Sequence, residues 1–87
     1  MTIETRTEFT TAEELLVALE ATAQRRAASD PDRISGSAYQ ALVAGTLRVA
    51  AFTKGGLWYE VRGDEREREV TRGVALLLLA AYLEWRS

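Results

Sequence analysis

Residues 37–54 read SAYQALVAGTLRVAAFTK, and the conformation of this stretch decides the fold class. Its apolar side chains recur at helical spacing and form a broad face of Tyr39, Leu42, Val43, Thr46, Val49 and Ala50. Its other side carries small residues, among them Gly45. Because a glycine inside a helix costs about 1 kcal/mol relative to alanine, Gly45 predicts the close approach of another backbone. We therefore expect a buried helix from about Ser37 to Lys54.

The sequence predicts one further helix on each side of this stretch. Thr11 and Glu14 have the spacing of a capping box, in which each side chain bonds the backbone N–H of the other residue. The helix that begins there should run to about Ala28, shortly before a proline. Asp64 with Glu67 resembles a second such box, so a third helix should begin near Asp64 and run nearly to the C-terminus. The expected fold is a mainly α, three-helix single domain of residues 1–87.

Two short segments alternate between apolar and polar residues with the period of a β-strand. Residues 2–9 read TIETRTEF, and residues 57–62 read LWYEVR. We expect them to form a short two-stranded β element beside the helices. For residues 2–9, a disordered N-terminal tail is the alternative interpretation.

Ten consecutive apolar residues, 74–83, lie within the predicted third helix. A helix of that length spans about 15 Å, half of a bilayer core, so we expect no membrane contact. On a helical wheel, one stripe consists of Val70, Val74, Leu77, Leu78, Ala81 and Trp85. We expect this stripe to pack on the other helices. Leu76, Leu79 and Leu83 lie nearly opposite, and we expect them to form the interface of a homodimer or higher oligomer.

The composition excludes several kinds of chemistry. The chain has no cysteine and no histidine, so it lacks a thiol nucleophile, the usual general base and the commonest metal ligands. We expect no metal site, no cofactor and no enzymatic activity. The polar, acidic start MTIETRTEF is unlike a signal peptide, which predicts a cytoplasmic protein. Abundant alanine and arginine indicate a GC-rich genome, bacterial or phage.

Candidate binding residues gather at Lys54, Trp58, Tyr59 and Arg62, where cations adjoin two aromatic side chains. If alternate residues of 57–62 face inward, Trp58 and Arg62 face outward together, and this pair is typical of interface hot spots. Packing of the Trp58 indole over small core residues is the competing interpretation. The pattern favours a small non-enzymatic protein that acts as a homo-oligomer and binds another protein, of the adaptor, inhibitor or antitoxin type.

Two other functions are open. One is a nucleic-acid-binding regulator whose basic surface forms only on oligomerisation, because the formal net charge of -2 provides no such surface in one copy. The other is a binder of a small ligand in the helical core.

Overall fold

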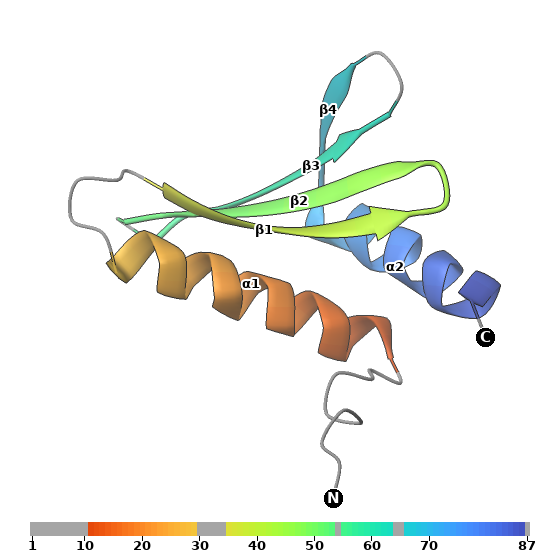
Figure 1. Cartoon of the computed structure of the whole chain (residues 1–87), viewed down its shortest axis with the longest axis horizontal. Helices are drawn as coiled ribbons and strands as arrows, with labels where there is room; N and C mark the ends of the chain where they lie inside the picture. Colours follow the sequence, from red (N-terminus) through yellow and green to blue (C-terminus); the bar gives the residue numbers. More distant parts are fainter. Residues whose placement is uncertain (1–10, 30–34, 54, 64–65, 87) are drawn as a thin grey trace, which may run out of the picture.

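The protein has an α+β fold, seen in a computed structural model that describes residues 11–29, 35–53, 55–63 and 66–86 (Figure 1). The element order is α1 (Ala12–Ser29), β1 (Ser35–Leu42), β2 (Gly45–Phe52), β3 (Leu57–Arg62), β4 (Glu67–Val70) and α2 (Arg72–Arg86). The four strands form one antiparallel sheet in the order β1-β2-β3-β4. Both helices pack against the same face of this sheet. The predicted mainly α, three-helix fold is therefore wrong.

The stretch predicted as the second helix forms the β1–β2 hairpin. Its register places Leu42 opposite Gly45, with a two-residue turn between them. Small residues such as Ala38 and Ala51 are compatible with either periodicity, so they did not distinguish helix from strand. The β-branched and aromatic residues among them favour a pleated sheet. The close approach expected at Gly45 is confirmed, because a Cβ there would lie 2.5 Å from the carbonyl oxygen of Arg62.

A strand occupies the predicted residues 57–62, but its partners differ from those expected. β3 pairs with β2 on one side and with β4 on the other. The proposed partner segment, residues 2–9, lies outside the described residues, as does Asp64. The residues expected to begin the third helix form β4 instead, and α2 begins at Arg72, where the Thr71 hydroxyl accepts a hydrogen bond from the backbone N–H of Val74 at 3.2 Å.

The first helix is confirmed together with its capping box. The backbone N–H of Glu14 donates to the Thr11 hydroxyl, and the backbone N–H of Thr11 donates to the Glu14 carboxylate. The buried apolar side of α1 lies against β1 and β2 at Leu15, Leu16, Leu19, Ala23 and Ala27. The two elements approach so closely that a Cβ on Gly36 of β1 would lie 2.4 Å from the backbone nitrogen of Ala27.

Helix α2 presents the opposite face to the core from the one predicted. Leu79 is 0% exposed, and Leu76 and Leu83 pack partly buried against the same core. These three residues contribute to the core of their own chain, so Leu79 is not available as an interface residue. The stripe expected inside contains exposed side chains, with Leu77 71% and Trp85 67% exposed. Among the described helices, none is both long and apolar enough to cross a bilayer.

Candidate functional site

The sheet face that points away from both helices, here called the open face, is the most distinctive surface of the molecule. Directly paired residues of antiparallel strands project to the same side, so the register defines its rows. One row contains Ser37, Ala50 and Trp58; the next contains Tyr39, Arg48, Glu60 and Glu69; the third contains Ala41, Thr46, Arg62 and Glu67. No helix or strand of the described chain covers these rows (Figure 1).

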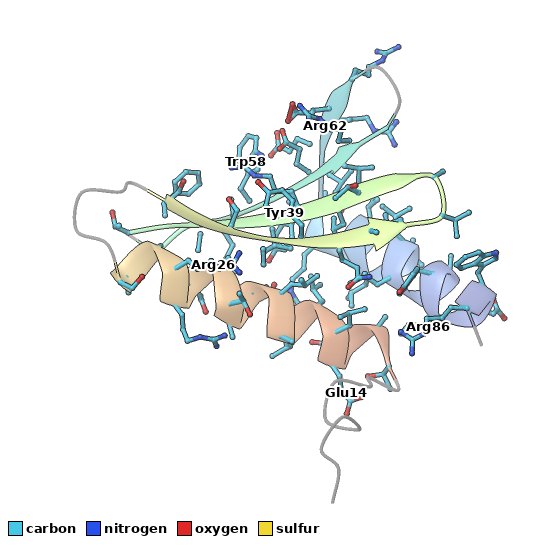
Figure 2. All side chains as sticks on the ribbon, in the orientation of Figure 1. Glu14, Arg26, Tyr39, Trp58, Arg62 and Arg86 are labelled. Atoms are coloured by element: carbon cyan, nitrogen blue, oxygen red, sulfur yellow. The ribbon has the colours of Figure 1, made fainter. Side chains whose placement is uncertain are left out.

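Aromatic side chains give the open face its apolar character. Tyr39, Phe52 and Trp58 are large, exposed residues of β1, β2 and β3. Trp58 and Arg62 project from the side of the sheet opposite α1 (Figure 2). Ala50 lies between Ser37 and Trp58 in the register and is only 1% exposed, although no described helix packs on this side. We call Tyr39, Phe52 and Trp58 the aromatic patch of the open face.

A shallow hollow of about 470 Å³ adjoins this patch, and it is lined by Tyr39, Thr46, Arg48, Glu60, Arg62 and Glu67. Two ion pairs lie in the hollow. The Arg48 guanidinium lies 2.9 Å from the Glu60 carboxylate, and Arg62 lies 2.9 Å from Glu67. The hydrogen bond with Glu60 raises the pKa of Arg48 against the opposing effect of burial. The open face therefore combines aromatic rings with cations that are already neutralised.

The structure brings together only part of the predicted binding group. Trp58 and Arg62 share the open face, as the alternation of residues 57–62 required. Tyr59 projects to the other face and is buried, and Lys54 lies outside the described residues. Sequence reasoning missed Tyr39, Arg48 and Phe52, because their segment was assigned to a helix. The alternation of buried Leu47, Val49 and Ala51 is the signal that could have placed them.

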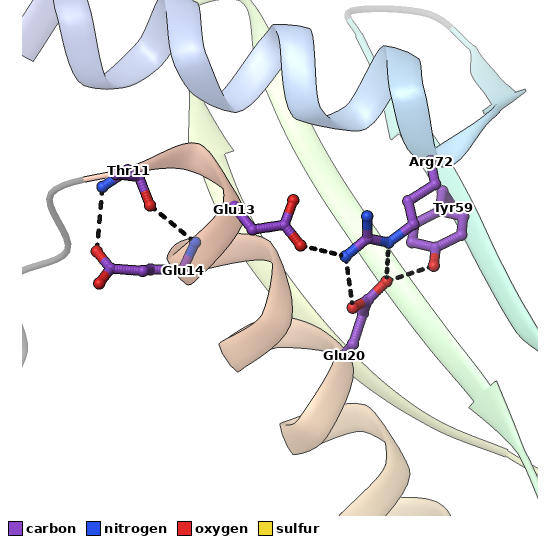
Figure 3. Close-up of polar contacts among 6 residues, drawn as sticks. All are labelled: Thr11, Glu13, Glu14, Glu20, Tyr59 and Arg72. Carbon is purple, nitrogen blue, oxygen red and sulfur yellow. Dashed lines mark hydrogen bonds and ion pairs between the residues drawn. The ribbon is translucent and has the colours of Figure 1, made fainter.

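A second polar group is centred on the buried Glu20 and joins α1, β3 and α2 (Figure 3). Glu20 is a charged residue of the buried side of α1. Its carboxylate accepts hydrogen bonds from the Tyr59 hydroxyl and from Arg72, at 2.7 Å from Nε and 3.2 Å from Nη2. Arg72 Nη2 also donates to Glu13 at 3.0 Å. We call Glu13, Glu20, Tyr59 and Arg72 the Glu20 cluster.

The protonation states of the Glu20 cluster favour a structural role rather than proton transfer. Burial alone would raise the pKa of Glu20, but the hydrogen bonds from Arg72 and Tyr59 and the charge of Arg72 outweigh it, so the pKa is lowered. Burial and the adjacent Glu20 raise the pKa of Tyr59 to about 12. Near neutral pH the carboxylate therefore stays ionised and the phenol stays protonated. Neither group has the pKa near the working pH that general acid–base catalysis requires.

In the part of the chain that the structure describes, no three acidic side chains are grouped so that they could hold a metal ion. Comparison of the chain with protein-family models, with curated proteins and with solved structures found no match. The surfaces of the molecule therefore give the main indications of its function.

Proposed function

We propose that this protein is a small, non-enzymatic binding protein whose open face docks on another protein. Adaptors, inhibitors and antitoxins are proteins of this kind. The supporting observation is the exposure of Tyr39, Phe52 and Trp58 beside Arg48 and Arg62, on a sheet face that no described helix or strand covers. Aromatic residues and arginine are enriched in the parts of interfaces that contribute most binding energy. A sheet face with an apolar patch is also the kind of surface that domains normally cover with another layer.

The charges of the open face favour a protein over a nucleic acid. Its two arginines are paired with Glu60 and Glu67, and Glu69 adds a third carboxylate. Phosphate binding would require both ion pairs to open beside these acids. A protein partner can instead pack on the aromatic rings while the ion pairs remain at the rim. The formal net charge of -2 on the whole chain points the same way.

The composition of the chain and the Glu20 cluster both support a non-enzymatic role. The chain contains no histidine or cysteine, and the Glu20 cluster keeps fixed protonation states near neutral pH. The hollow on the open face contains carboxylates, but each of its two arginines neutralises one of them.

Site-directed photo-crosslinking tests this proposal. A photo-reactive amino acid replaces Tyr39 on the open face, or Val17 on the exposed side of α1 as a matched control. We expect a protein from the host lysate to crosslink at position 39 and not at position 17. Introducing Trp58→Ala into the position-39 variant should remove the crosslink, because loss of a hot-spot residue weakens binding about thirtyfold or more. Circular dichroism checks that the variants stay folded.

Three outcomes would contradict the proposal. The first is equal crosslinking from positions 39 and 17. The second is a crosslink at position 39 that survives Trp58→Ala in a folded protein. The third is a nuclease-sensitive crosslink that disappears steeply with added salt, which would assign the open face to nucleic acid.

A further inference from the structure

The outward side of α2 is mostly apolar, and Glu84 in the last turn is its one charged residue before Arg86. We call this surface the outer stripe and define it as Gly73, Val74, Leu77, Ala80, Ala81 and Trp85. Leu77 and Trp85 are more than two-thirds exposed, while the inward side of the same helix is buried. A helix that is apolar on all sides is normally buried on all sides.

Helix α1 provides an internal comparison, because it packs against the same face of the sheet. Its exposed positions include Glu13, Glu14, Gln24 and Arg25, and Val17 is its one large exposed apolar residue. The outward side of α2 has no charged residue from Gly73 to Ala81, and Glu84 lies in its last turn. The apolar character of the outer stripe is thus specific to α2.

We infer that the outer stripe is a homodimer interface, in which α2 packs antiparallel against α2 of a second copy. A two-fold interface requires that residue i contacts residue j and residue j contacts residue i. An axis that crosses the helix at the level of Leu79 meets this requirement. It places Trp85 over Gly73 and Leu77 over Ala81 of the second copy, and Val74 opposite Glu84. The two most exposed large side chains of the stripe, Leu77 and Trp85, then each face a small residue.

Gly73 supports this arrangement independently. Its own chain gives no reason for a glycine, because an added Cβ would contact only the Thr71 hydroxyl oxygen, at 3.8 Å. Its φ is not positive, so backbone conformation does not demand glycine either. A glycine also lowers helix propensity. The absence of a side chain at position 73 makes sense if the Trp85 indole of a second copy occupies that space.

The small size of the outer stripe favours a weak dimer. Specific, stable interfaces bury about 1,200–2,000 Å² in total. The outer stripe is one face of a single 15-residue helix, about 22 Å long, so the interface is small for this class. We therefore expect a reversible dimer whose population rises with concentration. The outer stripe and the open face share no residue, so dimerisation leaves two open faces available for partner binding.

Sedimentation velocity over a wide range of protein concentration tests the inference. Wild type should shift from monomer to dimer as concentration rises. Leu77→Glu should raise the dimer dissociation constant about thirtyfold or more. Gly73→Leu is the sharper variant, since it improves helix propensity yet fills the space assigned to the second copy's indole. We expect Gly73→Leu to be monomeric with unchanged or higher helical content. Val17→Glu on α1 is the matched control and should dimerise like wild type.

The contrary results are equally clear. A wild type that remains monomeric at all concentrations overturns the inference. Equal weakening by Val17→Glu and Leu77→Glu would show that association is not through the outer stripe. A folded Gly73→Leu variant with wild-type dimerisation would exclude the antiparallel pairing.

Discussion

Replacing Glu20 by glutamine tests whether the Glu20 cluster stabilises the fold. The carboxylate accepts three hydrogen bonds, two of them from the charged Arg72. Glutamine keeps the shape but turns one acceptor oxygen into an NH₂ group, which faces a donor. Hydrogen bonds to charged groups contribute about 1.5–3 kcal/mol. Because Arg72 is partly exposed and keeps its bond to Glu13, we expect a loss of about 1.5–2 kcal/mol, or about 6–16 °C in Tm for a domain of this size.

The assay is urea unfolding followed by circular dichroism, at one low protein concentration so that self-association does not contribute. Glu67→Gln is the matched control, since Glu67 forms an ion pair of 2.9 Å with Arg62 on the surface. Exposed ion pairs contribute about 0–1 kcal/mol, so the control should lose much less stability than Glu20→Gln. Equal losses in the two variants would refute the structural role of the Glu20 cluster.

Further predictions concern close packing and pH. Gly36→Ala should lower the free energy of unfolding by about 1–3 kcal/mol, because the new Cβ overlaps the backbone of α1. Thermal unfolding measures this loss. Gly63→Ala is the control and should change the stability little, because no atom lies within 4 Å of a Cβ at that position. The pKa of Tyr59 is raised in the folded state to about 12, so its contribution is complete below pH 10 and is lost as the pH rises toward 12; the stability advantage of wild type over Tyr59→Phe should shrink over that interval. The pKa of Glu20 is lowered from 4.5 in the folded state. The stability advantage of wild type over Glu20→Gln should therefore be present above pH 4.5 and decline as the pH falls below it. Stability differences that do not change with pH, measured by urea unfolding, would contradict the roles given to Tyr59 and Glu20.

Local signals in the sequence predicted α1 and β3, whereas the β1–β2 hairpin depended on contacts distant in sequence. The capping box of Thr11 and Glu14 defines a helix start through groups three residues apart. The alternation of residues 57–62 likewise contains its own evidence for a strand. In residues 35–52, alanines occupy both inward and outward positions, so neither periodicity dominates. Strand pairing with β3 and packing under α1 decide the outcome there, and neither is visible locally.

The residues of the candidate site were also predictable only where local sequence signals placed their strand. Trp58 and Arg62 could be placed on one face because β3 was correctly assigned. The same alternation turns Tyr59 inward, so its inclusion in the predicted binding group rested on its position beside Trp58 rather than on geometry. Tyr39 and Phe52 reach the open face only through the hairpin register. When a strand is not predicted from the sequence, the surface residues on that strand are not predicted either.

The rotation of α2 shows how one ion pair to a buried carboxylate can specify which surface a molecule displays. A helical wheel of α2 has two apolar faces, and apolar side chains alone do not decide which one turns inward. Arg72 decides it, because it lies two turns before Leu79 on the same side of the helix. Its bond to Glu20, 52 residues away in sequence, holds that side against α1 and β3. Leu79 is then buried, and Leu77 and Trp85 must face outward. The ion pair between Arg72 and Glu20 thus holds α2 against the core and leaves the outer stripe exposed. This is the surface that we propose as the dimer interface.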